Sequence, residues 1–241
     1  MMEGEIVKDI FACLLTIGGA LSALKLFDEL ARRDVFDKLL SRKLVHITIG
    51  LLFMLFWPLF SDAPRSRYLA ALAPAGNAFR MLALGLGLWE DKALVKAITR
   101  EGNRRELLKG PFNYAIAISA VTILFWRNSP ISAVAVANLC AGDGIADIAG
   151  RSFGSIKLPY NKNKSYAGSF AMFIFSSFIS IVYLWFFSSF DFYNITASTI
   201  NQVIFVCFIS ALVESLPVST TLDDNFTVPF TAVIAGMLFL N

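Results

Sequence analysis

Two aspartates spaced four residues apart give the sequence its clearest indication of chemistry. Asp143 and Asp147 lie at one end of a long apolar run. A helix would place both carboxylates on one face, one turn apart. Carboxylates at this spacing repel each other unless a cation lies between them, and Mg²⁺ commonly takes one or two carboxylates together with substrate phosphates. We therefore expect Asp143 and Asp147 to bind a metal ion; the alternative is a solvated helix end that Gly142 and Gly144 cap.

Basic residues downstream of this pair predict a phosphate site. Lys157 and Lys164 precede Gly168 and Ser169, which open the next apolar run. The first turn of a helix offers free N–H groups, and ammonium groups supply full positive charge to a phosphate. The alternative is a loop whose lysines serve membrane topology alone.

Three further clusters carry charged side chains at the ends of apolar segments. Each alone is as typical of helix capping or membrane topology as of a binding site. We expect all five clusters to lie at one membrane face, where acids and bases together would bind a metal–polyphosphate. The further clusters contain Arg42, Lys43 and His46; Arg104, Arg105, Glu106 and Lys109; and Glu214, Asp223, Asp224 and Asn225.

Long apolar segments must position these residues. The chain is 56% hydrophobic and 16% charged, against about 25% charged residues in a typical soluble domain. A run of about 18 apolar residues can cross the hydrocarbon core. We predict an all-α, polytopic integral membrane bundle of about seven or eight helices, with residues 1–241 forming a single membrane-embedded domain. The predicted spans are residues 10–27, 44–60, 68–89, 112–126, 131–149, 167–190, 203–216 and 226–240.

The distribution of basic residues agrees with eight spans. Lysines and arginines concentrate in three segments, residues 28–43, 90–109 and 150–166. Eight spans, including the weak one that Pro74 interrupts, put these three segments on one face, as the positive-inside rule requires. No basic stripe with interleaved aromatic residues is present, so nucleic-acid binding is excluded.

Standard nucleotide-binding motifs are absent from the sequence. Lys164-Ser165 lacks the preceding glycine of a P-loop, and Gly142-Asp143-Gly144 lacks the third glycine of a dinucleotide loop. No His-Arg-Asp catalytic loop occurs either. A soluble kinase fold is therefore excluded.

Taken in order along the chain, the five clusters resemble the polyprenol kinases, a family that includes phytol, farnesol and dolichol kinases. The resemblance extends over residues 42–241 and is nearest to the plant plastid branch, the phytol and farnesol kinases. The segments that carry it are Arg42-Lys43-Leu-Val-His46, Arg104-Arg105-Glu106-Leu-Leu-Lys109-Gly-Pro111, Gly142-Asp143-Gly144-Ile-Ala-Asp147, Lys157-Leu-Pro-Tyr-Asn161-Lys-Asn-Lys164-Ser165 with Gly168-Ser169, and Glu214 with Asp223-Asp224-Asn225.

The resemblance implies transfer of a phosphoryl group from CTP to a prenyl alcohol that lies in the bilayer. The alcohol would be phytol, giving phytyl monophosphate, or farnesol or geranylgeraniol, in phytol salvage and tocopherol biosynthesis. It also implies a chloroplast membrane, although residues 1–9 are acidic and unlike a transit peptide.

The resemblance further implies roles for the clustered residues. Asp143 and Asp147 would hold Mg²⁺ on the nucleotide, and Asp223 or Asp224 would accept the alcohol proton or bind a second metal. The residues expected to contact nucleotide or phosphate are Arg42, Lys43, Arg104, Arg105, Lys157, Lys164, Gly142, Gly144, Ser165, Gly168 and Ser169. The expected site is completed by His46, Glu106, Glu214 and Asn225. The alternative role for Arg42, Lys43 and His46 is to anchor the second span.

Two other functions compete with this interpretation. A cytidylyl- or CDP-alcohol transferase also pairs aspartates with a cytidine nucleotide and a membrane, but the further downstream aspartates of that motif are absent. A small transporter would place its charges along a midplane path, whereas these charges cluster at one interface. Several prenyl alcohols, nucleotide donors and oligomeric states are compatible with the sequence.

Overall fold

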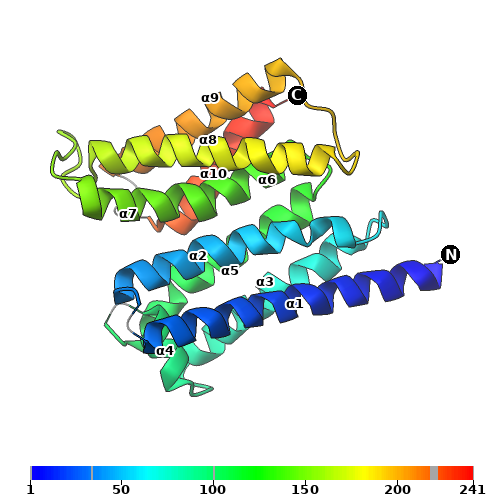
Figure 1. The fold of residues 1–241 in the computed structure, drawn as a ribbon, viewed down its shortest axis with the longest axis horizontal. Helices are drawn as coiled ribbons and strands as arrows, with labels where there is room; N and C mark the ends of the chain where they lie inside the picture. Colours follow the sequence, from blue (N-terminus) through cyan, green and yellow to red (C-terminus); the bar gives the residue numbers. More distant parts are fainter. Residues whose placement is uncertain (1, 34, 100, 218–221, 241) are drawn as a thin grey trace. The chain divides into compact units, whose positions relative to one another are not determined.

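The chain folds into α-helices, as its composition predicts. The computed structural model describes residues 2–33, 35–99, 101–217 and 222–240. It is 79% helical, and the described residues form no β-strand, which confirms the all-α membrane bundle. The helices are α1 (Met2–Arg32), α2 (Lys38–Leu55), α3 (Ser66–Leu86), α4 (Lys92–Ile98), α5 (Gly110–Phe125), α6 (Pro130–Ala137), α7 (Asp143–Phe153), α8 (Tyr166–Ser188), α9 (Ala197–Ser215) and α10 (Asp224–Phe239). Short 3₁₀ segments η1 (Trp57–Leu59) and η2 (Arg104–Leu108) and a π-helical turn η3 (Asn138–Gly142) complete the order (Figure 1).

Seven helical segments in the described residues have the length and apolar composition to cross a membrane. They match the first seven predicted spans. The weak third one is a continuous helix, α3, despite Pro74 in its interior, and it ends at Gly87, whose φ of 79° suits glycine. The eighth predicted span is α10, which is apolar but shorter than the others.

The chain divides into two compact units, residues 1–124 and 125–241, and each is described by itself. In the first unit, α1 packs against α2 and α3, and η2 packs against α3. The carboxylate of Asp9, on α1, is completely buried and accepts hydrogen bonds from Ser61 N (2.6 Å), Ser61 Oγ (2.9 Å) and Ser66 Oγ (2.9 Å). Because Ser66 begins α3, this carboxylate also faces the positive end of that helix dipole.

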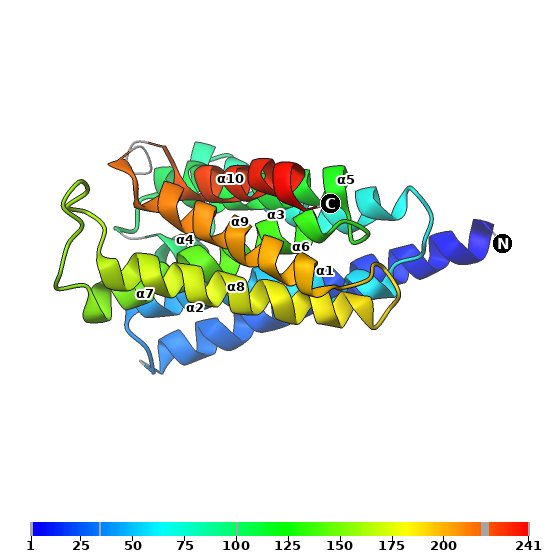
Figure 2. The ribbon, with the colours of Figure 1, turned by 90° about the horizontal axis from the view of Figure 1, so that it is seen from above.

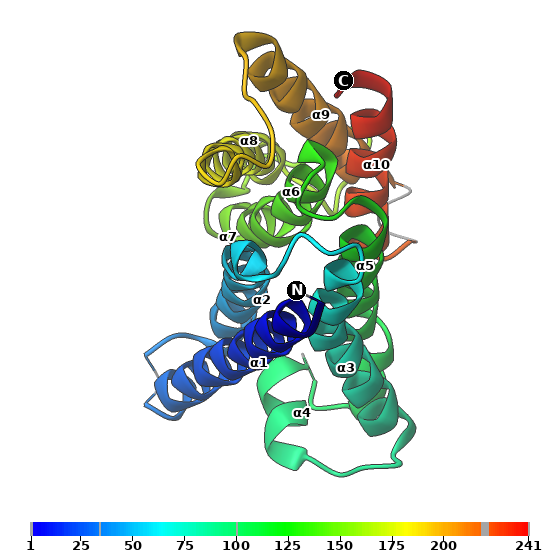
Figure 3. The same cartoon turned by 90° about the vertical axis from the view of Figure 1, so that its right-hand side faces the viewer.

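In the second unit, one interrupted helix forms the centre. Helix α6, the π turn and α7 run as a single segment, Pro130–Phe153. Of its most apolar 18-residue stretch, 78% is buried. Helices α8, α9 and α10 pack around it (Figures 2 and 3). A Cβ on Gly168 would lie only 2.9 Å from Ala146 O, so this glycine lets α8 approach α7 closely.

Helix α8 presents large apolar side chains on its exposed face. On α8, the side chains of Phe170, Phe178 and Trp185 are exposed to 67%, 59% and 64%. Exposed rings of this size are expected where lipid tails, rather than water, surround the helix.

Candidate active site

Three carboxylates from three helices meet in the second unit. Asp143 on α7, Glu214 on the last turn of α9 and Asp224 at the start of α10 each offer an oxygen, and these oxygens lie within 4.8 Å of one another. Asp143 is 5% exposed and Glu214 is 3% exposed. Burying like charges so close together is costly unless a cation compensates them.

The ammonium group of Lys164 supplies one such compensation. It donates hydrogen bonds to Glu214 Oε1 and, at 3.0 Å, to Asp224 Oδ2. Burial of Lys164 would lower its pKa, but the charges of Glu214 and Asp224 outweigh burial and hold the pKa above its usual value. The lysine therefore stays protonated in this cluster.

The environment of Asp224 disfavours the negative charge of its carboxylate. It is the first residue of α10, outside the seven spanning helices. Burial raises the pKa of its carboxyl to about 6, and the negative charges of Asp143 and Glu214 add to this, although Lys164 acts in the opposite direction. Its Oδ1 atom is buried and has no hydrogen-bond partner among the described residues.

The π turn before α7 sets the position of Asp143. The N–H of Asp143 donates to the carbonyl of Asn138, five residues earlier, instead of four. One extra residue is thus accommodated in the turn, which rotates α7 relative to α6. Such π turns occur mostly as single turns inside helices and frequently at functional sites.

A tight loop between α7 and α8 presents Lys164. Its two sides are joined by hydrogen bonds from Leu158 N to Lys164 O (3.1 Å) and from Tyr166 N to Ile156 O (3.2 Å). The amide of Asn161, 5% exposed, donates to the carbonyls of Ser215 (3.0 Å) and Leu216 (3.2 Å) at the end of α9. Asn161 therefore links the loop that carries Lys164 to the helix that carries Glu214.

Replacement of Asn161 by aspartate is expected to lower the free energy of unfolding by about 2–3 kcal/mol, because a carboxylate cannot donate to the two carbonyls and repels them. Urea or thermal unfolding of the detergent-solubilised protein measures the change. The matched control is Asn163→Asp, which adds the same charge two residues away on an exposed side chain. Equal destabilisation by both variants would contradict a special role for Asn161.

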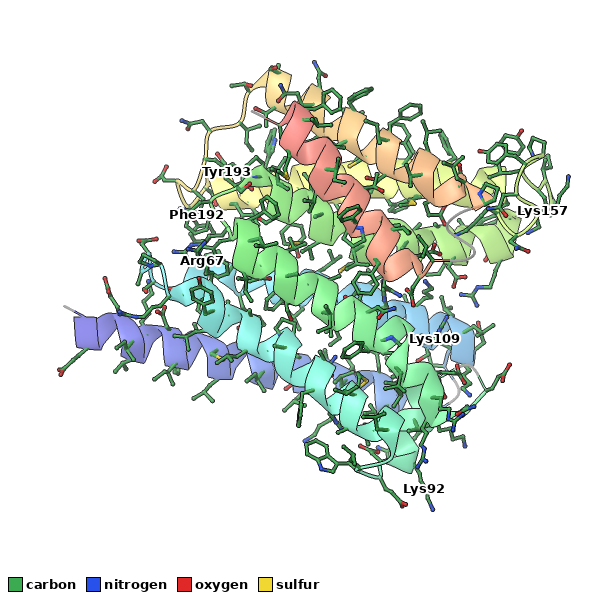
Figure 4. The ribbon with its side chains drawn as sticks, turned by 180° about the vertical axis from the view of Figure 1, so that it is seen from behind. Arg67, Lys92, Lys109, Lys157, Phe192 and Tyr193 are labelled. Carbon is green, nitrogen blue, oxygen red and sulfur yellow. The ribbon has the colours of Figure 1, made fainter. Side chains whose placement is uncertain are left out.

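The other predicted residues of this unit have identifiable positions. Asp147 forms an ion pair with Arg151 (2.9 Å) and is not part of the three-carboxylate group, so its role as a metal ligand stays a prediction. Ser165 Oγ caps α8 by accepting from Gly168 N (3.2 Å). Lys157 is exposed on the loop, at the end of the unit opposite to Phe192 and Tyr193 (Figure 4).

Local structure accounts for several other residues of the predicted site. Asp223 is the N-cap of α10 and accepts from Asn225 N (2.9 Å) and Asn225 Nδ2 (2.7 Å). Gly142 and Gly144 are buried, and a Cβ on Gly142 would lie 3.2 Å from Ser176 Cβ. Ser169 Oγ is buried and has no partner among the residues that the structure describes.

In the first unit, Arg42, Lys43 and His46 lie on α2, and the His46 ring lies against Tyr114 of α5. Tyr114, on α5, donates its hydroxyl to His46 O (2.7 Å), and the two rings lie 4.2 Å apart. Helix α4 contacts both α2 and η2, in agreement with a shared face for the first two basic segments. The roles of Arg42 and Lys43 toward phosphate stay predictions.

The cluster Arg104–Glu106 is partly explained by local structure. Glu106 accepts from Asn103 N (3.3 Å) and Asn103 caps the same 3₁₀ turn, so Glu106 is a capping residue. The guanidinium group of Arg104 lies against Gly87, at the carboxyl end of α3, where the helix dipole favours a cation. Phosphate contacts by Arg104 and Arg105 also stay predictions.

Sequence reasoning gave no role to two buried amides, Asn138 and Asn161. Both lie within or beside predicted site segments. A polar side chain in a predicted membrane span was the available signal for Asn138, whereas nothing in the sequence distinguishes Asn161 from Asn163 in the same loop.

The chain is a polytopic membrane protein by the seven helices of spanning length among its described residues. It also carries a cluster of three carboxylates whose negative charge Lys164 partly neutralises, a kind of site that is common in enzymes. Comparison with known proteins identifies the kind of enzyme. The chain is 52% identical over 235 residues to "Probable phytol kinase 3, chloroplastic" of Glycine max, covering 98% of this chain and 74% of that protein. It is 47% identical over 236 residues to the farnesol kinase of Arabidopsis thaliana (98% and 77% covered) and 45% identical over 235 residues to phytol kinase 1 of the same plant (97% and 77%).

The chain therefore belongs to the phytol and farnesol kinase family, which confirms the resemblance found in the sequence. It is an enzyme of the phosphotransferase class. No protein-family model and no solved structure matches the chain.

Proposed function

We propose that the chain transfers the terminal phosphoryl group of a nucleoside triphosphate to the hydroxyl group of a prenyl alcohol, phytol or farnesol. The names of its relatives support this reaction. The single structural observation that supports it is the group of Asp143, Glu214 and Asp224 around Lys164. Acids and a lysine held together at the end of membrane helices suit a metal-bound polyphosphate and an alcohol that arrives from the bilayer.

A magnesium ion fits the residues present. Hard carboxylate oxygens are its preferred protein ligands, three of them lie within 4.8 Å of one another, and Asp224 Oδ1 has no partner among the described residues. Asp143, Glu214 and Asp224 would hold the ion. When bound, it would offset the negative charge that develops on the transferring phosphoryl group.

The positions of the side chains support the remaining roles that we propose. Lys164 Nζ donates to Glu214 and Asp224. An ammonium group has three N–H donors, so we propose that the third contacts a phosphate at the same cluster. Of the two aspartates expected to accept the alcohol proton, Asp223 is engaged as a helix cap, whereas Asp224 faces the cluster. We propose Asp224 for that role or for metal binding.

We propose the donor and the cellular role from the resemblance to the family. The resemblance to polyprenol kinases supports CTP as the donor and a role in phytol salvage and tocopherol biosynthesis. Relatives named as chloroplastic, together with the spanning helices, support an integral chloroplast membrane protein.

The reaction is tested with membranes that contain the chain, CTP labelled at the γ-phosphate, Mg²⁺, and phytol or farnesol in parallel. We expect a labelled lipid monophosphate, and the faster alcohol identifies the preferred substrate. Lipid labelled by CTP that carries its label at the α-phosphate, but not by γ-labelled CTP, would show transfer of CMP and support a cytidylyltransferase. Nucleotide hydrolysis that depends on the alcohol but gives no phosphorylated lipid would support a transporter.

A further inference from the structure

Asn138 is a completely buried amide within the membrane-spanning segment Pro130–Phe153. Its Nδ2 donates to the carbonyl of Val134 (2.8 Å) and to Cys207 Sγ (3.3 Å). Because the Val134 carbonyl can only accept, the amide atom that faces it must be Nδ2, and Oδ1 points the other way. The Oδ1 atom is buried and accepts no hydrogen bond from any described residue.

An unsatisfied acceptor at this depth requires a physical explanation. Leaving a buried polar atom without a partner costs free energy, and polar side chains inside membrane helices commonly mark substrate paths. The hydroxyl groups nearby, in contrast, have hydrogen-bond partners. Ser176 Oγ donates to Phe173 O (3.3 Å), and Ser180 Oγ lies 3.7 Å from Cys207 Sγ. A donor from a ligand would satisfy the Asn138 oxygen.

The π turn aligns Asn138 with the carboxylate cluster. In an α-helix, five residues separate two side chains by about 140° around the axis. Here the N–H of Asp143 donates to the carbonyl of Asn138, so the two residues lie one above the other, a single turn apart. Asn138 is thus on the face of Asp143 but deeper in the membrane-spanning segment.

Buried polar side chains from α8 and α9 continue the connection. A Cβ on Gly142, next to Asp143, would lie 3.2 Å from Ser176 Cβ. Cys207 contacts Asn138, Ser180 in turn contacts Cys207, and Ser176, Ser180 and Cys207 are completely buried. Cys207 is seven residues before Glu214 on α9, which is about two turns on the same face. Buried polar side chains therefore lie between the carboxylate cluster and Asn138.

We propose that Asn138 Oδ1 accepts a hydrogen bond from the hydroxyl group of the prenyl alcohol and so holds that oxygen within one helical turn of Asp143. This inference rests on the proposed function. The substrate matches the environment, because a prenyl alcohol carries one O–H donor on an otherwise apolar chain. The amide oxygen thus selects an alcohol over an ether or hydrocarbon of the same length, which has no hydrogen to donate.

The test measures binding of labelled phytol to the full chain in nanodiscs, with unlabelled phytol and phytyl methyl ether as competitors. The wild-type protein is expected to prefer phytol over the ether by about 10- to 100-fold, and Asn138→Leu is expected to abolish this preference. In the kinase assay, Asn138→Leu is expected to raise the KM for phytol by a similar factor and to leave the KM for CTP unchanged.

The matched control is Ser210→Ala. Ser210 is also completely buried, and its hydroxyl donates only to Val206 O (3.0 Å) of its own helix in the described structure. Its loss is expected to change neither the alcohol–ether preference nor either KM. If Asn138→Leu fails to reach the membrane, Asn138→Ser, which withdraws the amide oxygen with a smaller change in polarity, is measured in the same way.

A purely structural amide would give a different result. Asn138→Leu would then alter thermal stability but retain the preference for phytol over its ether, and this outcome would overturn the inference. An equal rise in the KM of both substrates would overturn it as well. The binding measurement needs no phosphoryl transfer, so a wild-type protein that prefers phytol over the ether yet forms no phosphorylated lipid would refute the proposed reaction alone.

Discussion

Replacement of Asp143 by asparagine is expected to reduce turnover by roughly 10²- to 10³-fold while the protein still inserts and folds. Asparagine keeps the size of the side chain but removes one of three negative charges that lie within 4.8 Å of one another. The cluster then binds a divalent cation more weakly. Folding is expected to be preserved, because removing one of several crowded carboxylates relieves repulsion. The measurement is the rate of phosphorylated lipid formation as a function of Mg²⁺ concentration.

Comparison with Asp147→Asn distinguishes two arrangements of the metal site. If the two aspartates on α7 share the ion, both variants will lose turnover to a similar extent. If Asp143 acts with Glu214 and Asp224, Asp147→Asn will lose much less, since Asp147 is paired with Arg151 instead. Asp191→Asn, on an exposed residue with a φ of 59° that asparagine tolerates, is the control for the substitution itself. Full activity of Asp143→Asn would exclude Asp143 from the site.

The helices were predictable because the membrane imposes a simple rule on the sequence. Every segment that must cross the hydrocarbon core has to be predominantly apolar over about 18 residues or more. For that reason the predicted spans coincide with helices even at α3, where Pro74 weakened the pattern. Only α10 fell short of a full span, and its predicted limits, residues 226–240, nevertheless lie close to the helix.

The partners within the site could not be predicted in the same way. Helical spacing correctly identifies Asp143 and Asp147 as neighbours along one helix, but the group around Asp143 comes from α9 and α10, more than 70 residues later in the chain. Which side chains meet depends on the π turn and on the close packing of α8 at Gly168, and neither leaves a periodic signal. Glu214 was nevertheless detectable as a lone acid in an apolar helix.

Replacement of Lys164 by methionine is expected to reduce turnover by roughly 10²-fold and to make folding depend on Mg²⁺. Methionine keeps most of the length but removes the charge that compensates Glu214 and Asp224. Breaking a buried pair costs about 3–5 kcal/mol, and the partial exposure of Lys164 and Asp224 reduces that figure here. A bound divalent cation would replace the lost charge. Thermal unfolding in detergent, measured with Mg²⁺ and with EDTA, reports this dependence.

Matched variants separate the charge of Lys164 from its geometry. Lys162→Met changes an exposed lysine of the same loop and is expected to alter neither turnover nor the Mg²⁺ dependence of unfolding. Lys164→Arg retains the charge, so it is expected to keep most of the stability; a larger, planar head group will still impair turnover. Equal behaviour of Lys162→Met and Lys164→Met would contradict a specific role for Lys164.

The double variant Lys164→Met with Glu214→Gln then distinguishes stability from catalysis. Removing both partners of the buried pair leaves no isolated charge at Glu214, so much of the stability lost in Lys164→Met is expected to return. Turnover is not expected to return, because the same change removes a proposed metal ligand and a proposed phosphate contact. Recovery of stability without activity would mean that these residues are retained for the reaction. Recovery of both would mean that the pair only holds α9 and the loop before α8 together, and the site would then have to be sought elsewhere among the polar clusters.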